Sequence, residues 1–177
     1  MNDPILARLS ALVRDVPDFP RPGILFKDFT PLLADPRALA LAVELMANPH
    51  RGQGIQAVVG AESRGFIFGI AIAQALSAGF IPVRKAGKLP REVRRVTYEL
   101  EYGTDRLEMH ADAVSKGTKV LLVDDLLATG GTLQACCELL SGAGAQIAAM
   151  TVLIEIESLK GRERLKGLAP VHSVIRC

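Results

Sequence analysis

The sequence has few of the features that are typical of a secreted protein, a membrane-spanning protein or a protein stabilised by a structural metal. Its 177 residues include three cysteines, an odd number without metal-ligand spacing, so neither a disulfide framework nor a zinc site is expected. The longest apolar runs fall well short of the ~18–20 residues that cross a bilayer. The first ten residues, MNDPILARLS, lack a basic segment ahead of an apolar block. We therefore expect no secretory signal and a cytoplasmic protein.

An excess of charge of one sign is also absent. The formal net charge is only +2, which is too small by itself to indicate a nucleic-acid-binding protein. What the sequence does contain is a large apolar fraction, 49% of its residues, and this excludes a disordered chain. A length of 177 residues without a break in composition predicts one domain, residues 1–177, with a substantial core.

Hydrophobic periodicity predicts alternating helices and strands. Apolar residues at helical spacing predict helices over residues 3–15, 35–46, 65–76 and 132–140. Short apolar runs predict buried strands at residues 56–60, 80–85, 120–125 and 147–156, with a final edge strand at 171–175. The proline-rich residues 17–31 are predicted to be extended, and alternation around residues 102–105 predicts a β-hairpin. This order indicates an α/β fold with a mostly parallel, twisted sheet flanked by helices.

The segment VLLVDDLLATGGT, residues 120–132, indicates a ligand site. In parallel sheets, ligands bind where strands end and the following helices begin. Gly130 and Gly131 permit close backbone approach, Thr129 and Thr132 offer hydroxyl groups, and the predicted helix presents free N–H groups. Together these features are typical of a phosphate cradle. The Gly-Lys-Ser/Thr ending of nucleotide hydrolases and the three-glycine dinucleotide fingerprint are both absent.

Two adjacent carboxylates, Asp124 and Asp125, precede this loop. Because carboxylates repel phosphate, they indicate a ligand with additional groups. Carboxylates accept hydrogen bonds from a diol or reach a metal through water. A ribose 5-phosphate carries both a phosphate and a diol. The structural alternative is that the acids cap a helix while the glycines form a turn.

The whole segment resembles the phosphoribosyl-pyrophosphate (PRPP) binding motif of the type I phosphoribosyltransferases, and DDLLATGGT is similar to the variant in the adenine-specific members. The resemblance extends from Pro17 to Lys166, including ESLKGRERL near the C-terminus. It implies that Asp124 and Asp125 contact the ribose hydroxyls, with substrate-bound Mg²⁺ reached through water. It also implies that the 5′-phosphate is held by Ala128, Thr129, Gly130, Gly131 and Thr132.

A second loop, VVGAESRGF at residues 58–66, lies between a predicted strand and a predicted helix. The cation of Arg64 beside free N–H groups suits an anion, although a solvated surface turn explains the residues equally well. The resemblance implies that Glu62, Ser63 and Arg64 form the pyrophosphate loop. In this fold that loop often contains a cis peptide, which corresponds here to Glu62–Ser63.

Residues 84–95, RKAGKLPREVRR, hold six basic side chains and one acid. Such a run is usually a solvated face, and the lack of interleaved aromatic residues disfavours a single-stranded nucleic-acid site. A leaving pyrophosphate suits the positive charge better. Residues 84–90 resemble the RK-x-GKLP signature of adenine-specific enzymes. This implies that Arg84 and Lys88 meet pyrophosphate, in this or a neighbouring subunit's site, and that the chain forms a homodimer.

Residues 98–105, YELEYGTD, would by alternation alone form a charged hairpin surface. However, LEYG resembles the mobile flap, here at about residues 90–112, that closes over the substrates in this family. The resemblance aligns Glu101 with the acid–base carboxylate at the purine imidazole ring. It aligns Tyr102 with the tyrosine of the flap. Closure would exclude water from a reactive sugar centre.

Residues 17–33 could simply be an N-terminal strap, but they resemble the hood, at about residues 1–34, that selects the base. The resemblance implies an adenine site formed by Leu25, Phe26, Lys27 and Leu126, in which the backbone of Leu25 reads the base edge and Phe26 stacks on the ring. Adenine's N1 acceptor and N6 donor match a peptide N–H and C=O. A 6-oxopurine presents the reverse pattern and would leave buried groups unpaired.

The implied function is transfer of a phosphoribosyl group from PRPP to adenine, giving AMP and pyrophosphate. One alternative is a non-catalytic regulator on the same fold that senses PRPP or a nucleotide through residues 124–132. Another is a nucleic-acid-binding module that uses residues 84–95. We expect adenine and PRPP as partners, and neither nucleic acid nor a membrane.

Overall fold

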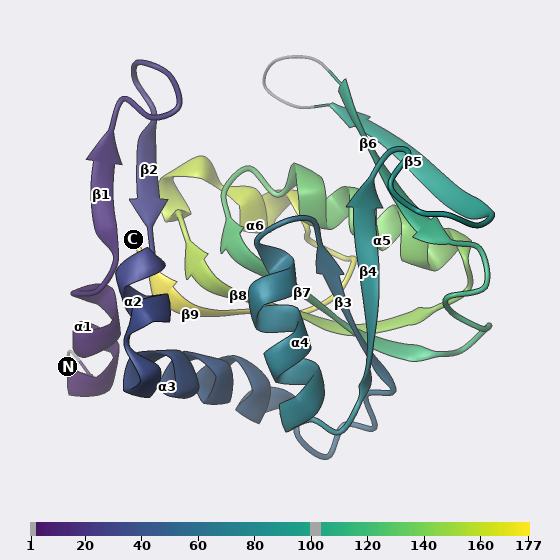
Figure 1. The fold of residues 1–177 in the computed structure, drawn as a ribbon, viewed down its shortest axis with the longest axis horizontal. Coiled ribbons are helices and arrows are strands. Elements are labelled where there is room, and N and C mark those ends of the chain that lie inside the picture. Colours follow the sequence, from purple (N-terminus) through teal and green to yellow (C-terminus); the bar gives the residue numbers. More distant parts are fainter. Residues whose placement is uncertain (1–2, 100–103) are drawn as a thin grey trace.

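The computed structural model describes residues 3–99 and 104–177 (Figure 1). Its central feature is a seven-stranded sheet with the order β5-β6-β4-β3-β7-β8-β9. β4, β3, β7, β8 and β9 are parallel, whereas β6 pairs antiparallel with β4 and β5. The predicted α/β fold with a mostly parallel sheet is therefore confirmed. The strands are β3 (Ala57–Ala61), β4 (Gly79–Lys85), β5 (Val93–Glu99), β6 (Thr104–His110), β7 (Lys119–Leu127), β8 (Gln146–Glu155) and β9 (Val171–Arg176).

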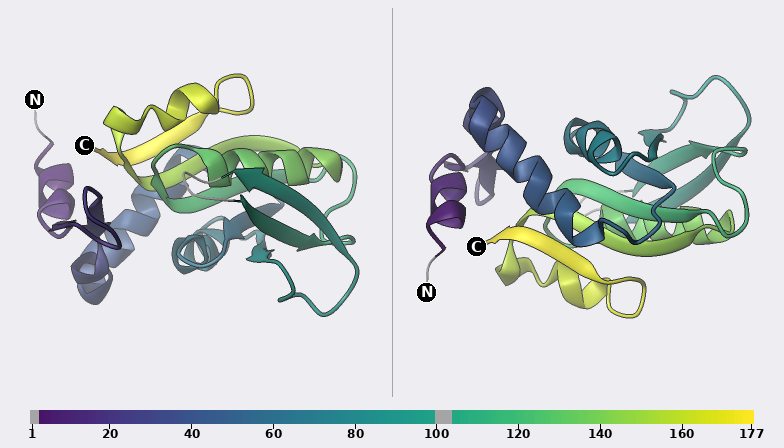
Figure 2. Two further views of the ribbon diagram at one scale, coloured as in Figure 1. Left: turned by 90° about the horizontal axis from the view of Figure 1, so that it is seen from above. Right: turned by 90° about the horizontal axis from the view of Figure 1, so that it is seen from below.

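Helices cover both faces of the sheet because the central strands send apolar side chains to each face in turn. On β3, Val58 joins the core beneath α3 (Pro36–Ala47) and α4 (Gly65–Ala75). The next residue, Val59, joins the opposite core, which α5 (Gly131–Gly142) closes. Figure 2 shows α4 and α5 on opposite sides of the sheet. Burial on both faces explains why these strands are continuous apolar runs in the sequence.

The N-terminal region differs from the sequence-based prediction. The helix predicted over residues 3–15 is wrong beyond Ser10, where α1 (Pro4–Ser10) ends. The chain then forms β1 (Arg14–Pro17), which pairs antiparallel with β2 (Leu25–Asp28). Strand pairing with β2 supplies the hydrogen bonds of these residues, so tertiary context overrides the helix that the apolar spacing of residues 5–13 predicts.

A second correction concerns residues 17–31, which were predicted to be wholly extended. Their last two residues, Thr30 and Pro31, instead begin α2 (Thr30–Ala34), in whose first turn proline is favoured. The other predicted helices correspond to α3, α4 and α5. The remaining helical turns are η1 (Asn48–His50), η2 (Glu157–Leu159) and α6 (Gly161–Arg164).

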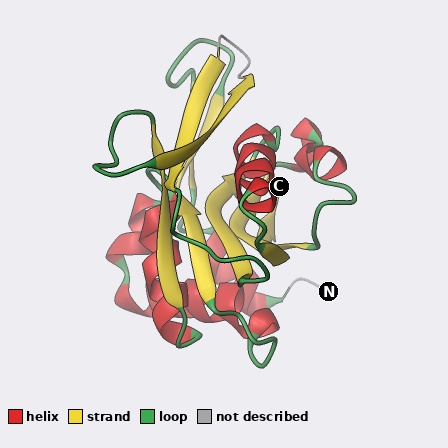
Figure 3. Ribbon diagram, turned by 90° about the vertical axis from the view of Figure 1, so that its right-hand side faces the viewer, coloured by secondary structure: helices red, strands yellow, loops and turns green. Residues whose placement is uncertain are grey.

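β5 and β6 form the predicted hairpin, with Val93 paired to His110 at its base. Figure 3 shows these two strands extending past the helices. The hairpin joins the sheet through the pairing of β6 with β4. Its tip, residues 100–103, contains Glu101 and Tyr102 and lies outside the described residues. The roles assigned to these two side chains therefore stay predictions.

Candidate active site

The carboxyl ends of β3 and β7 are the natural place for a ligand. These strands are parallel neighbours at the centre of the sheet. β3 leads into α4 on one face, whereas β7 leads into α5 on the other. Where the connections of adjacent strands diverge in this way, α/β proteins leave a crevice that binds ligands. The two loops singled out in the sequence follow these strands.

Asp124 and Asp125 lie within β7 and are 9% and 3% exposed. Burial raises the pKa of both carboxyl groups, and the charge of Asp125 raises that of Asp124 further. Arg64 Nε lies 3.0 Å from Asp125 Oδ2, but this buried oxygen has no aligned hydrogen-bond donor. A ligand that donates hydrogen bonds, or a cation, would therefore stabilise the ionised pair.

The glycine loop after β7 is shaped by its backbone. Gly130 has φ = +81°, a left-handed conformation that favours glycine, and α5 begins at the next residue. The first N–H groups of α5 have no partner within the helix, as a phosphate site requires. Behind the loop lies Gly161, whose carbonyl oxygen would be 2.8 Å from a Cβ added at Gly130.

Glu62 accepts contacts from basic residues at the end of β4 and just beyond it. Arg84 Nε lies 3.1 Å from one of its carboxylate oxygens, and Lys88 Nζ donates to the other. The backbone N–H of Lys85 donates to Glu62 as well, at 3.1 Å. The side chain of Glu62 is 10% exposed, so this segment is more than a solvated turn. The Glu62–Ser63 peptide is cis, as the resemblance implies.

These contacts predict a loss of stability in acid. Although burial acts to raise the pKa of Glu62, hydrogen bonds from Lys88, the Lys85 N–H and Arg84 bring it to about 2, below the ordinary 4.5. A lowered carboxyl pKa gives stability that is complete above pH 4.5 and is lost as the pH falls toward 2. We expect Glu62→Gln to have a lower urea midpoint than the unaltered protein at pH 7. The difference should narrow steadily below pH 4.5; a constant difference would contradict this account.

A cavity of about 880 Å³ adjoins the phosphate loop. It brings the four residues predicted to bind adenine together with Arg64 and the loop, although these segments lie far apart in the sequence. The other predicted site residues that the structure describes are not among its lining residues: Glu62, Ser63, Arg84, Lys88, Asp124, Asp125 and Gly130. The lining is Pro20, Arg21, Pro22, Gly23, Ile24, Leu25, Phe26, Lys27, Arg64, Leu126, Ala128, Thr129, Gly131, Thr132, Ile156, Ser158, Leu159 and Cys177.

Arg64 contacts both the aromatic residues on the base side of the cavity and an acid of β7. Its guanidinium carbon lies 5.1 Å from the ring centre of Phe26 and 5.8 Å from that of Phe29, within the range of a cation–π contact. The same side chain pairs with Asp125. Lys27, in contrast, donates to Asp15 at 2.7 Å, which anchors β2 to β1. Arg64 thus connects the base-side wall of the cavity to the acids of β7.

Sequence reasoning assigned no role to the cavity wall formed by Ile156, Ser158, Leu159 and Cys177. Ser158 and Leu159 belong to η2, within the ESLKGRERL segment that matched the family, and Ile156 directly precedes that segment. Their proximity depends on the parallel pairing of β7 with β8, which places Leu127 beside Glu155. No local pattern in the sequence predicts that pairing, so the matched motif was the only indication.

The basic run at residues 84–95 is partly neutralised by carboxylates. Besides the contacts with Glu62, Lys85 pairs with Asp105 at 3.2 Å, and Arg91 pairs with Asp112. The run therefore presents less free positive charge than its sequence suggests. A shallower groove of about 910 Å³ borders α1, α2 and α3 and contains none of the predicted site residues.

Two diverging loops, a pair of buried acids and a glycine-rich loop at the centre of a parallel sheet fit the class of the phosphoribosyltransferases. In agreement, the family model described as "Phosphoribosyl transferase domain" matches residues 30–174. The chain is 55% identical to an adenine phosphoribosyltransferase of Nitrosococcus oceani, over 96% of this chain and 99% of the relative. It is 54% identical to that of Methylococcus capsulatus, over 95% and 98%.

Solved structures agree with these relatives. The adenine phosphoribosyltransferase of Rhodothermus marinus superimposes with a TM-score of 0.95 at 49% identity, covering 99% of this chain and 100% of that one. That of Saccharomyces cerevisiae, complexed with an imino-altritol bisphosphate and adenine, gives 0.90 at 39% identity, covering 97% and 98%. The chain therefore belongs to the adenine phosphoribosyltransferase family.

Proposed function

We propose that this protein transfers the phosphoribosyl group of PRPP to adenine and releases AMP and pyrophosphate, a reaction of purine salvage. The observation that carries the proposal is the shared cavity: the glycine loop and the predicted base-binding residues line one space. Arg64 ties that space to the buried acids. Phosphate, diol and base thus have complementary groups within one continuous site.

In this proposal the β7 acids, Asp124 and Asp125, accept hydrogen bonds from the ribose hydroxyls, and residues 128–132 hold the 5′-phosphate. Ser63 and Arg64 contact the pyrophosphate. Arg84 and Lys88, which Glu62 keeps together, supply positive charge as it leaves. Because no covalent nucleophile is needed, orientation and electrostatics provide most of the rate acceleration. Adenine N9 then attacks C1′ of the ribose.

The residues also fit a substrate-bound Mg²⁺. Magnesium prefers oxygen ligands and keeps several waters, and Asp125 Oδ2 is a buried carboxylate oxygen with an unused acceptor. Asp124 and Asp125 would hold such an ion through water. When bound, Mg²⁺ neutralises the charge of the pyrophosphate.

For the base, we propose that Phe26 stacks on adenine and that Leu25 reads its edge through backbone N–H and C=O groups. Leu126 and Lys27 complete the walls of this pocket. The described hairpin of β5 and β6 belongs to the proposed flap at residues 90–112, and β1 and β2 belong to the proposed hood at residues 1–34. Residues 1–177 act as one domain in this proposal.

The test is an assay of the purified protein with Mg²⁺, PRPP and each purine base separately. We expect conversion of adenine, because a peptide edge matches its donor and acceptor, and little conversion of guanine or hypoxanthine. Omitting Mg²⁺ serves as the control for the metal. Equal conversion of all three bases would contradict adenine specificity. Binding of PRPP without turnover of any base would favour the regulator instead.

The phosphate loop gives a prediction with a matched control. Gly130→Ala should raise the KM for PRPP by about 10-fold, since the added methyl group meets Gly161 and forces the loop to move. Gly167 has a similar φ of +85°, but a Cβ there has open space around it. Gly167→Ala carries the same backbone strain and should leave this KM unchanged. Equal effects of the two substitutions would show that strain, not loop position, is responsible.

We also propose that the chain forms a homodimer. Ile67 and Ile70 lie on one side of α4 and are 43% and 51% exposed. Covering this apolar surface with a second copy is favourable. Light scattering should give twice the mass of one chain, and a single-chain mass at micromolar concentration would refute the proposal.

We propose that the protein is located in the cytoplasm, because its described cysteines are free thiols. In the part of the chain that the structure describes, no helix is both long enough and apolar enough to span a bilayer. Cys136 and Cys137 are buried free thiols, and Cys177 is an exposed one. Free thiols persist in a reducing compartment, which supports a location in the cytoplasm.

A further inference from the structure

Gly161, at the start of α6, packs directly against the phosphate loop. A Cβ added to it would lie 2.1 Å from the carbonyl oxygen of Ala128 and 3.0 Å from the backbone nitrogen of Gly130. The contact is reciprocal, because a Cβ at Gly130 would lie 2.8 Å from the carbonyl oxygen of Gly161. The two backbones therefore touch directly, with the side chain of Leu127 beside the contact. Any displacement of Gly161 changes the position of the loop.

The segment that carries Gly161 cannot hold this position by local structure alone. α6 spans only residues Gly161–Arg164, and a helix of one turn is unstable by itself. The preceding residue, Lys160, has φ = +53° and ψ = +27°, a left-handed conformation that is unfavourable for a residue with a side chain. Other contacts must therefore hold the turn in place.

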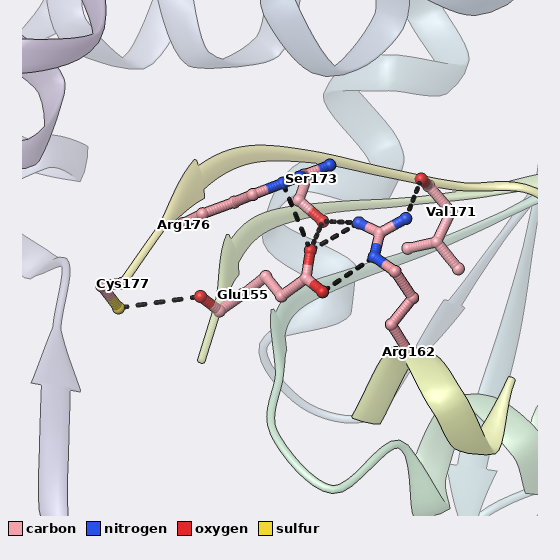
Figure 4. A network of polar contacts seen from close by, with 6 residues as sticks. All are labelled: Glu155, Arg162, Val171, Ser173, Arg176 and Cys177. Atoms are coloured by element: carbon pink, nitrogen blue, oxygen red, sulfur yellow. Dashed lines mark hydrogen bonds and ion pairs between the residues drawn. The ribbon is translucent and has the colours of Figure 1, made fainter. Parts of the chain in front are cut away.

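Arg164 donates to Gln134 of α5 at 2.6 Å, and Leu165 is buried in the core. The largest set of contacts comes from Arg162, which is anchored to the last residue of β8 and the first half of β9 (Figure 4). Its Nε donates to Glu155 at 2.9 Å, and a second guanidinium nitrogen donates to the other carboxylate oxygen. Further donations reach the Val171 carbonyl at 2.7 Å and Ser173 Oγ at 3.0 Å. Ser173 in turn donates to Glu155 at 2.6 Å.

Glu155 accepts most of the hydrogen bonds in this network. Its side chain is 6% exposed and it ends β8, whose pairing partner there is Leu127, the last residue of β7. The backbone N–H of Ile156 donates to the Leu127 carbonyl at 2.9 Å. One carboxylate thus connects β8, β9 and α6 immediately beside the start of the phosphate loop. Because the pair of Arg162 and Glu155 is bidentate, it also fixes the orientation of the guanidinium group, which a single hydrogen bond does not.

We propose that Glu155 and Arg162 are positioning residues for the sugar phosphate: their ion pair holds Gly161 against Ala128 and Gly130 and thereby sets the conformation of the phosphate loop. Neither residue lines the cavity, so both act through the backbone of Gly161. The inference rests on the proposed function, because it requires the loop to bind the 5′-phosphate of PRPP.

The test compares Arg162→Met, Arg162→Lys and Glu155→Gln in the full chain, with Lys166→Met as the control that removes an exposed charge just beyond α6. Steady-state kinetics give kcat and the KM values for PRPP and adenine, and calorimetry gives the Kd for ribose 5-phosphate. Arg162→Met should raise the KM for PRPP and this Kd by about 10-fold. The KM for adenine and kcat should change by less than about 2-fold.

Rescue and coupling make the test specific. Lysine at position 162 keeps the charge but loses the bidentate contact, so it should restore part of the affinity. Gly161→Ala displaces the loop directly. Combined with Arg162→Met, it should therefore raise the KM for PRPP no further than the larger single effect. Circular dichroism and thermal melting confirm that each variant is folded at the assay temperature.

Equal increases in both KM values, a fall in kcat alone, or additive effects of Gly161→Ala and Arg162→Met would overturn the positioning role. The positioning role is also overturned if Arg162→Met changes the KM for PRPP and the Kd for ribose 5-phosphate no more than Lys166→Met does. If the unaltered protein neither binds ribose 5-phosphate nor uses PRPP, the proposed function is overturned, and this inference with it. These outcomes separate the failure of the positioning role from the failure of the proposed function.

Discussion

Glu101→Ala should lower kcat by about 100- to 10,000-fold, the range that a positioned acid–base group contributes. In the proposed reaction the imidazole ring of adenine loses a proton as N9 bonds to C1′ of the ribose. A carboxylate at position 101 would accept that proton. Alanine cannot, so the chemical step slows while the sugar-phosphate site on β7 and α5 remains intact. The Kd for ribose 5-phosphate should therefore change by less than about 2-fold.

Glu92→Ala is the matched control for Glu101→Ala. Glu92 is an exposed acid just before β5, at the base of the same hairpin, so its removal changes the net charge equally without touching the tip. We expect its kcat to equal that of the unaltered protein. If Glu101→Ala weakens ribose 5-phosphate binding while kcat is retained, Glu101 binds substrate and is not the acid–base group.

Asp124→Asn should have opposite effects on activity and stability. In the proposed site, Asp124 accepts hydrogen bonds from the ribose, and hydrogen bonds to a charged group contribute roughly 1.5–3 kcal/mol. Losing them should lower kcat/KM for PRPP by about 10- to 100-fold. The free protein, however, should gain stability, because burial and the neighbouring Asp125 disfavour the ionised carboxyl group. A neutral amide removes that repulsion.

The pH dependence of Asp124→Asn follows from the direction of the pKa shift. A carboxyl pKa that folding raises gives stability at low pH, and this stability is lost as the pH rises through the folded-state value. The variant should therefore melt higher than the unaltered protein at pH 7, and the difference should shrink toward pH 4. For a chain of this size, about 1 kcal/mol corresponds to roughly 2–4 °C. Melting in the presence of EDTA excludes metal effects. Asp112→Asn, at an exposed acid, should show no such gain.

Much of the site was predictable because its parts are continuous in the chain. A buried strand, two acids and a glycine loop follow one another in residues 120–132, so periodicity and composition place them at the end of a strand. The N-terminal region shows the limit of this reasoning. Apolar spacing predicts a helix over residues 3–15, yet α1 ends at Ser10 and residues 14–17 form β1 because β2 is available as a partner. Local preference yields to strand pairing here.

The sequence by itself determined the order of the main helices and strands from α3 onward, the glycine loop and the acids beside it, since each depends on neighbouring residues. Only the tertiary structure brought Glu62 to Arg84 and Lys88, Arg64 to Asp125, and Gly161 to Gly130. These pairs join separate strand–loop units, and sheet register and helix packing decide which units meet. The contact of Gly161 with the loop further requires the ion pair of Arg162 and Glu155. Hydrophobic periodicity carries no information about such contacts because they form between backbones and polar groups far apart in the chain.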